Sequence, residues 1–305
     1  DIVFNAVEFH WVARRKDARD GLFSIEQVAL HEIGHLLGLD HSPLGAATMA
    51  FETGDGATTW SQLSTDEIAF VRAVYPDPDA GIATAGLRGR VTTSGGLPVE
   101  AAAVYLENPK GVVVAGTVSE VDGAYEIHGV APDTYSVWLG PLDAPTVDRA
   151  RSLRLPWEIG TRFGTLEFGY QSFATTESVA PISLGASGVH ELNLTAQGTP
   201  TAFRVTGWQG PDNAMGGPLF PRRFGVHATQ GTQGRFLKVF GLDFPATGLQ
   251  LEVSGSGVRV GELTVTDNAL GIIDVAEGAL EIEGDAVAGM RRITLSDAAG
   301  ASVSV

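Results

Sequence analysis

The decisive stretch of this chain is His31-Glu32-Ile33-Gly34-His35-Leu36-Leu37-Gly38-Leu39-Asp40-His41. Residues four apart on an α-helix lie on one face, about 6 Å apart along the axis, so His31 and His35 can aim their imidazoles at one point. Gly38 lets the backbone turn sharply, and His41 can then return as a third imidazole. Three such ligands with an open fourth position are typical of catalytic zinc. The pattern therefore predicts a zinc site.

Glu32 stands beside the first of these histidines and cannot easily bind the same ion. A carboxylate in this place can instead accept a proton from a water that the metal activates, and later pass it to the leaving amine of a peptide. A lone pair of histidines four apart is common on helix surfaces without any such role. Here the glutamate, the glycine and the third histidine occur together, so we predict that Glu32 is a general base.

Composition limits the classes of function. The chain has 305 residues, enough for two or three domains. It contains no cysteine, which excludes disulfides and thiolate metal ligands. Its net charge of −16 disfavours nucleic acid as a partner, because phosphate contacts need a basic surface. No apolar run reaches the roughly eighteen residues of a membrane-spanning helix, so no membrane span is expected.

Capping signals predict two helices. Ser24 with Gln27 three residues later forms a capping-box arrangement, which opens the helix that carries the histidines. Ser64 with Glu67 opens a second helix in the same way, and this helix should end before Pro76. Both helices belong to the N-terminal quarter of the chain.

The segments around these helices are expected to be non-helical. Residues 2–9 form an apolar run that predicts a strand, and residues 41–60 predict an irregular loop. The stretch Pro76-Asp77-Pro78-Asp79-Ala80-Gly81 has the composition of a linker.

The extended histidine motif is similar to that of the metzincins, and Leu-Gly-Leu-Asp-His-Ser at 37–42 resembles the matrixin branch most. Ala47-Thr48-Met49 matches the methionine-bearing turn that lies beneath the zinc in that family. Residues 63–68, leading to Val74-Tyr75-Pro76, resemble the closing helix of a matrixin catalytic domain. Residues 2–5 and Trp11 resemble the strand and tryptophan that precede the active-site helix.

The resemblance implies a secreted zinc metalloendopeptidase that acts on protein or peptide substrates. It assigns residues 1–79 to the C-terminal part of an α+β metzincin catalytic domain, with Met49 packing under the histidines rather than binding metal. It also implies that the first half of that domain, with the edge strand on which substrate pairs, and any propeptide precede this chain. No signal peptide is visible.

Three features depart from the matrixin pattern. Val3 stands where matrixins often carry a histidine for a second, structural zinc, so such a zinc is not expected. Asn5 and Glu8 match the calcium ligands only in part, which leaves calcium as a secondary expectation. Phe51 replaces the tyrosine of other metzincin branches, which favours matrixins over astacins and serralysins.

Two roles are open for other polar residues near the motif. Asp40 either hydrogen-bonds in support of the ligands or is a solvated turn residue, and Glu52 with Asp55 either shapes the substrate pocket or lies in a plain loop. The basic run Arg14-Arg15-Lys16 is expected to be a solvated loop. The remaining histidines lack partners at ligand spacing and are expected to be surface or strand residues: His10, His128, His190 and His227.

Beyond the linker the pattern changes to short alternating runs separated by glycine, proline and asparagine, which predict strands. A further break is expected near residues 198–200. The predicted strands are 87–92, 103–106, 112–118, 124–127, 135–139, 236–240, 249–253, 262–265, 271–275 and 292–295.

These runs resemble two known modules. Asp122-Gly123-Ala124-Tyr125 and Pro132-Asp133-Thr134-Tyr135 resemble the carboxypeptidase regulatory-like domain, which we place at 86–197 with an insertion over 141–180. Residues 237–244 and 288–293 resemble an IPT/TIG-type module, which we place at 200–305. The expected fold is thus a partial metzincin domain followed by two all-β immunoglobulin-like sandwiches.

The β modules show no catalytic constellation, so binding, spacing or contacts with extracellular matrix or cell envelope are their expected roles. This leaves a competing hypothesis. The chain would then be a non-catalytic extracellular binding or adhesion protein whose zinc domain is vestigial or incomplete. The intact motif favours the peptidase, whereas the expected loss of the upper half of its domain leaves the alternative open.

Overall fold

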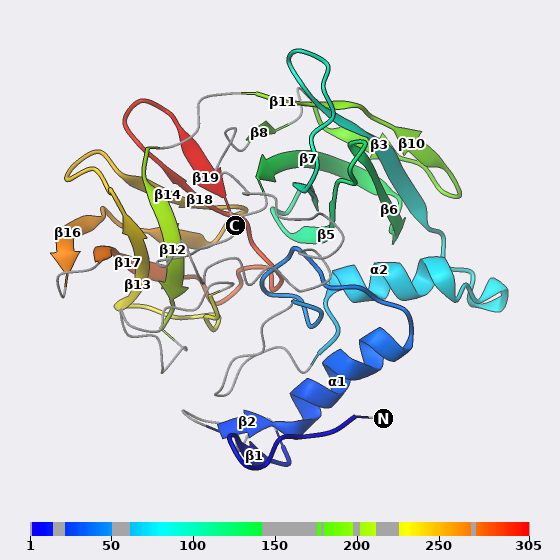
Figure 1. Ribbon diagram of the computed structural model, residues 1–305, viewed down its shortest axis with the longest axis horizontal. Helices are drawn as coiled ribbons and strands as arrows, with labels where there is room; N and C mark the ends of the chain where they lie inside the picture. The colour runs from blue at the N-terminus through cyan, green and yellow to red at the C-terminus, as the bar shows by residue number, and fades with distance from the viewer. Residues whose placement is uncertain are drawn as a thin grey trace.

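The computed structural model describes residues 2–14, 22–50, 62–141, 176–177, 180–197, 202–211, 226–269 and 273–304. Within these ranges the chain is mostly β-sheet with few helices, as Figure 1 shows. Three groups of elements follow one another along the chain. We call them the first unit (described residues up to 80), the second unit (85–196) and the third unit (204–304).

The first unit contains both α-helices of the described chain. A short parallel pair, β1 (His10–Val12) and β2 (Leu22–Ser24), leads into α1 (Ile25–Leu36). Helix α2 (Thr65–Val74) follows, and a single 3-10 turn, η2 (Pro78–Ala80), ends the unit. The expected linker is therefore short and partly ordered.

Both predicted helices and their caps are confirmed. The Ser24 hydroxyl accepts a hydrogen bond from the backbone N–H of Gln27 at the start of α1. At α2 the Ser64 hydroxyl accepts from the backbone, and the Glu67 carboxylate accepts from the Ser64 N–H, which completes a capping box. These short-range bonds satisfy backbone donors that a helix start leaves unpaired.

The strand predicted over residues 2–9 is wrong. The Asn5 side chain accepts hydrogen bonds from the backbone N–H groups of Val7 and Glu8, which closes a turn instead. The Trp11 indole donates to the Asn5 carbonyl and packs edge-on against Phe4, so the segment folds back on β1. An asparagine side chain thus competes successfully with strand pairing.

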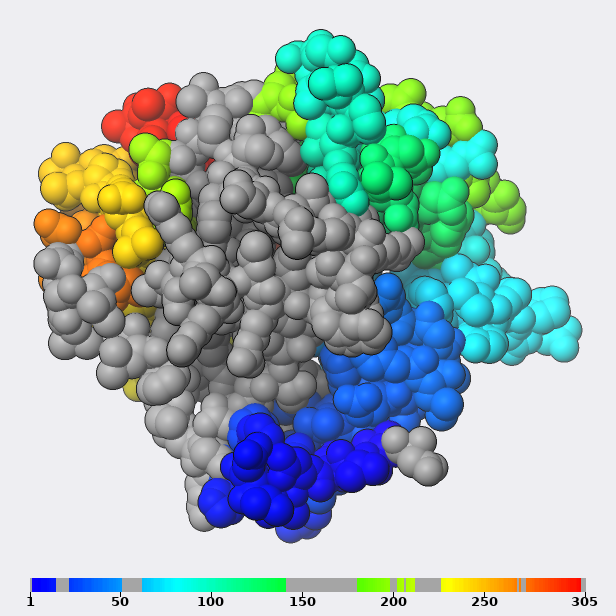
Figure 2. All heavy atoms as spheres, in the orientation of Figure 1, coloured from blue at the N-terminus to red at the C-terminus, as the bar shows by residue number. Residues whose placement is uncertain are grey.

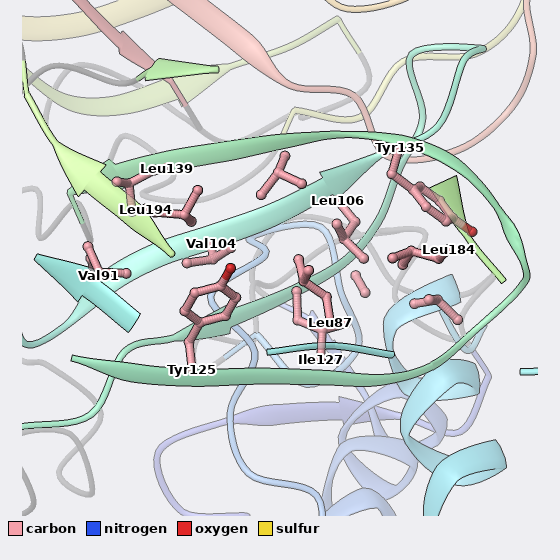
Figure 3. Close-up of a cluster of buried hydrophobic side chains, with 14 of the residues drawn as sticks. Leu87, Val91, Val104, Leu106, Tyr125, Ile127, Tyr135, Leu139, Leu184 and Leu194 are labelled. Atoms are coloured by element: carbon pink, nitrogen blue, oxygen red, sulfur yellow. The ribbon is translucent and has the colours of Figure 1, made fainter. Parts of the chain in front are cut away.

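The second unit consists of two sheets with a shared core. In one sheet β3 pairs with β6, β10 and β11, and in the other β7 pairs with β4, β8 and β9, while β5 pairs with β4. Figure 3 shows side chains of the two sheets, among them Leu87 and Val104, pointing toward each other. The strands are β3 (Ala85–Thr93), β4 (Ala102–Glu107), β5 (Val113–Val118), β6 (Ala124–Val130), β7 (Asp133–Pro141), β8 (Thr176–Glu177), β9 (Ile182–Leu184), β10 (Val189–Glu191) and β11 (Leu194–Ala196).

The third unit also consists of two sheets that enclose a core, but its strands pair in a different order. A five-stranded sheet in the order β12-β13-β17-β15, with β16 beside β17, faces the three-stranded sheet β14-β18-β19. Its core is centred on the fully buried side chains of Phe203, Trp208 and Leu295. The strands are β12 (Arg204–Gln209), β13 (Arg235–Leu242), β14 (Gln250–Val253), β15 (Val258–Val260), β16 (Thr264–Ala269), β17 (Ile273–Ile282), β18 (Ile293–Ser296) and β19 (Ser302–Ser304).

Every strand predicted beyond the linker overlaps an observed strand, with shifted ends. No predicted run covers the short strands β8, β9, β10, β11, β15 and β19, or the longer strand β12. In β12, Gly207 interrupts the alternation of side chains at a register shift between Val205 and Gly207. Most of the expected insertion and the break near 198–200 lie outside the described residues. The domain boundaries 1–79, 86–197 and 200–305 stay predictions.

The second and third units are joined by a polar junction. Arg292 of the third unit pairs with Glu107 at 3.0 Å, and both side chains are largely buried. The Arg292 guanidinium also lies 3.4 Å from the centroid of the Trp138 ring. The Ser254 hydroxyl donates to the Gly111 carbonyl at 2.7 Å. Specific side-chain contacts therefore connect the two units.

Candidate metal centre

The structure brings the three predicted ligands together. His31 and His35 lie on the same face of α1, one turn apart, and His41 follows the helix end. Gly38 has a φ of +93°, a left-handed conformation that a side chain disfavours, and it turns the chain back toward the helix. One ligand atom of each histidine lies within 4.8 Å of those of the other two. This is the predicted group, assembled from a helix and the loop that follows it.

Hydrogen bonds fix which ring nitrogen of two histidines faces the common point. His31 Nδ1 lies 2.7 Å from the Thr48 carbonyl oxygen, and His35 Nδ1 lies 2.9 Å from that of Leu39. A carbonyl can only accept, so in each ring Nδ1 carries the proton and donates. The lone pair is then on Nε2, which is the form that binds a metal.

Electrostatics favour the neutral form of His31. Burial lowers its pKa below the usual value, and the neighbouring His35 acts in the same direction. The bond to Thr48 and the charges of Glu32 and Glu67 oppose this shift without cancelling it. Because metal ligands must be deprotonated, a lowered pKa leaves less proton competition for this nitrogen.

Met49 lies directly against the helix that carries the ligands. Only 1% of its surface is exposed, and a Cβ added to Gly34 would lie 2.3 Å from its sulfur atom. Gly34 therefore permits a close approach between α1 and the methionine turn. No role was predicted for Gly34, although a glycine inside a helix is a signal of close packing.

The turn is held by backbone pairing and by α2. The Ser42 N–H donates to the Met49 carbonyl at 2.8 Å, and the Met49 N–H donates to the Glu67 carboxylate at 2.9 Å. Glu67 was predicted only as a helix cap, yet it is 2% exposed and joins α2 to the turn. Thr48 was likewise quoted only as part of the methionine turn, although its carbonyl orients His31. Such long-range partners leave no sequence signal.

The other residues near the motif are placed as follows. Glu32 is half-buried on α1 directly after His31. The Asp40 carboxylate accepts a hydrogen bond from the backbone N–H of His41 at 2.8 Å, so it holds the backbone of a ligand residue. Phe51, Glu52 and Asp55 lie outside the described residues, as do Arg15 and Lys16.

Further metal sites gain no support. Val3, at the position of the structural-zinc histidine of matrixins, is 88% exposed. At the partial calcium match, the Asn5 amide donates to the Glu8 carboxylate at 3.1 Å, so the side chains of Asn5 and Glu8 bond to each other. Among the described residues, the three motif histidines are the one group with metal-binding geometry, which leaves calcium unsupported. His10, His128 and His190 are exposed as predicted, whereas His227 is buried outside any strand.

Family models match two parts of the chain. Residues 1–76 match the model described as Matrixin, and residues 86–139 match the carboxypeptidase regulatory-like domain. The suspected order of these two families is thereby confirmed, while the IPT/TIG-type resemblance is not. No curated protein matches the chain.

Comparison with solved structures found distant likenesses. The major pilin subunit BcpA of Bacillus cereus is 9% identical, over 73% of this chain and 67% of that one, with a TM-score of 0.23. Fervidolysin of Fervidobacterium pennivorans is 11% identical, over 75% of this chain and 31% of that one, with a TM-score of 0.24. Scores this low support no conclusion. Within the described residues, no helix has the length and apolar character needed to cross a membrane.

Proposed function

We propose that this chain is the metal-binding part of a zinc-dependent metalloendopeptidase of matrixin type. His31, His35 and His41 would hold the zinc ion, and Glu32 would be the general base. The observation that carries the proposal is the convergence of three imidazoles, two of which direct their Nδ1 protons to backbone carbonyls. The match of residues 1–76 to the matrixin model supports the same assignment.

The donor set fits zinc. Three neutral imidazoles with room for one further ligand form a typical catalytic zinc site. A bound zinc ion supplies a Lewis acid that lowers the pKa of a water toward ~7 and polarises a peptide carbonyl. The carbonyls of Thr48 and Leu39 would hold two imidazoles in the orientation and tautomer this requires.

Glu32 would move the proton. It directly follows His31 on α1, so its carboxylate would lie beside the metal position without needing to bind the ion. It would accept a proton from the attacking water and return it to the leaving nitrogen as the peptide bond breaks. Met49 would support the ligands from below by packing against Gly34.

The proposal extends to the whole chain. We assign residues 1–79 to the peptidase part, 86–197 to a carboxypeptidase regulatory-like sandwich and 200–305 to an IPT/TIG-like sandwich. The facing sheets of the second and third units support two immunoglobulin-like modules. A secreted protein acting on proteins or peptides, with these modules for binding or spacing, fits this organisation.

The test combines zinc stoichiometry with proteolysis of casein. We expect one zinc per chain and casein cleavage that Glu32→Gln reduces about 10²- to 10⁴-fold with zinc retained. Glu26→Gln, an exposed glutamate in the first turn of α1, is the matched control and should leave the rate unchanged. Equal rates in the Glu32 and Glu26 variants would refute the general base.

The same experiment distinguishes the peptidase from the competing function, a non-catalytic binding or adhesion protein. If the 305-residue chain binds zinc stoichiometrically but cleaves no casein, the non-catalytic binding or adhesion protein would be favoured over the peptidase. If no zinc binds, the metal centre itself would be refuted.

A further inference from the structure

We propose that Asp66 and strand β5 of the second unit position the metal loop, defined as residues 41–50, so that zinc affinity depends on a unit that supplies no ligand. This inference rests on the proposed function. It makes Asp66 a positioning residue and the second unit a structural part of the metal centre rather than an independent attachment.

Asp66 forms hydrogen bonds with both sides of the junction. The Ser42 hydroxyl donates to one carboxylate oxygen at 2.6 Å, and the backbone N–H of Gly116 donates to the other at 2.9 Å. Ser42 directly follows His41, and Gly116 lies in the middle of β5. The Asp66 carboxylate on α2 therefore connects the metal loop to the second unit.

Apolar packing reinforces this connection. Leu44 and Ala47 of the metal loop form a buried cluster with Val113 of β5, against which Tyr105 and Met290 pack. A Cβ added to Gly116 would lie 3.1 Å from Leu44, so strand and loop are already in close contact. The cluster contains residues of all three units.

Helix α2 is docked on the second unit next to this cluster. A Cβ on Gly129, in β6, would lie 1.8 Å from the carbonyl oxygen of Ala69 in α2. This approach leaves no room for a side chain, and Gly129 also has a φ of +74°. In Figure 1 α2 runs along the lower edge of β5 and β6, and in Figure 2 the regions of α1 (blue) and α2 (cyan) meet on one face.

The metal loop sets two features of the metal centre. It begins with His41, the ligand that lies off the helix, and it includes Thr48, whose carbonyl orients His31. The loop is closed by the bond from the Ser42 N–H to Met49. A shift of Ser42 therefore moves one ligand directly and a second through its hydrogen-bond partner. Groups that orient ligands in this way commonly change metal affinity about 10- to 100-fold.

The experiment measures metal affinity in the 305-residue chain by competition with a chelator, and the absorption spectrum of bound Co²⁺ as a report on ligand geometry. We expect Asp66→Ala to weaken Zn²⁺ binding about 10-fold or more and to change the Co²⁺ spectrum. Asp66→Asn should restore both, since its amide can still accept from Gly116 and donate to Ser42. The matched control is Asp297→Ala, which removes an aspartate that accepts from the backbone N–H groups of Ala299 and Ala301 in the third unit.

A wild-type affinity and Co²⁺ spectrum in Asp66→Ala would overturn the proposal. Failure of the unaltered chain to bind metal would refute the proposed function instead, so the two failures are distinguishable. If Asp66→Ala does not fold, Gly129→Ala replaces it, because its Cβ collides with the α2 backbone. Gly96→Ala is its control, with a φ of +79° and no atom within 4 Å of the added Cβ. Equal zinc affinity in these two glycine variants would also overturn the proposal.

Discussion

Helix α1 and strand β4 bury their apolar side chains to very different extents. In α1, Leu36 is 82% exposed and Ile33 is 43% exposed. In β4, Val104 and Leu106 are fully buried between two sheets. The strand is held by the core of its own unit, whereas the helix with the ligands is held by Met49, by hydrogen bonds and, we propose, by metal. The comparison teaches that the proposed metal centre lies where the apolar core of this chain is weakest.

The largest expected effect compares one leucine from each region. Leu106→Ala should reduce the free energy of unfolding by about 2–5 kcal/mol, because it leaves a cavity in a closed core. Leu36→Ala should change it by less than about 0.5 kcal/mol, since that side chain is already in water. Urea unfolding followed by tryptophan fluorescence measures both. Similar losses in the two variants would contradict the contrast between helix and strand.

Zinc should act on the helix and not on the strand. At a free concentration about 100 times its Kd, zinc adds about 2.7 kcal/mol to the stability of whatever binds it. We expect hydrogen exchange to slow for the backbone amides of α1 and residues 41–50, with little change in β4. The control is His35→Ala, which should lose the response. Protection spread equally over the chain would mean that the units unfold only together.

A side chain added at Gly34, where α1 contacts Met49, should lower the free energy of unfolding. Alanine is a better helix former than glycine by about 1 kcal/mol, but Gly34→Ala should still destabilise by about 1–3 kcal/mol, because the new Cβ meets the Met49 sulfur. In a Met49→Ala background the same substitution should become stabilising. A double-mutant cycle by thermal unfolding measures this coupling, and additive effects would show that the two residues do not touch.

The smallest expected effect concerns Asp66. Burial raises its pKa to about 6, although the hydrogen bonds from Ser42 and Gly116 oppose the shift. The folded state then holds a proton that the unfolded state has released, so this contribution to stability is present at low pH and is lost as the pH rises through about 6.

Between pH 6 and 7 the metal-free chain should therefore lose on the order of a few tenths of a kcal/mol relative to Asp66→Asn. Denaturant unfolding of both proteins at the two pH values measures this difference. A difference of the opposite sign would show that the hydrogen bonds outweigh burial and hold the carboxylate ionised.

Short-range signals account for what could be predicted. The ligand spacing in α1, the caps at Ser24 and Ser64 and the turn at Gly38 each depend on residues within four positions of one another, and the structure has each of them. The strand predicted over 2–9 is wrong because of another short-range effect, since Asn5 closes a turn with its own side chain. Strand β12 was not predicted because a register shift breaks the alternation of its side chains, and six strands of two or three residues are too short to show an alternating pattern.

By itself, the sequence determined which three histidines come together and where the two helices begin, because helical periodicity and capping act over a few residues. Only the tertiary structure decided what holds that centre in place. Glu67 reaches Met49, Asp66 reaches Gly116, and Gly129 admits the backbone of α2, all across long separations in the chain. Such contacts depend on how whole units pack, and packing is set by shape and burial in three dimensions, which no local pattern records.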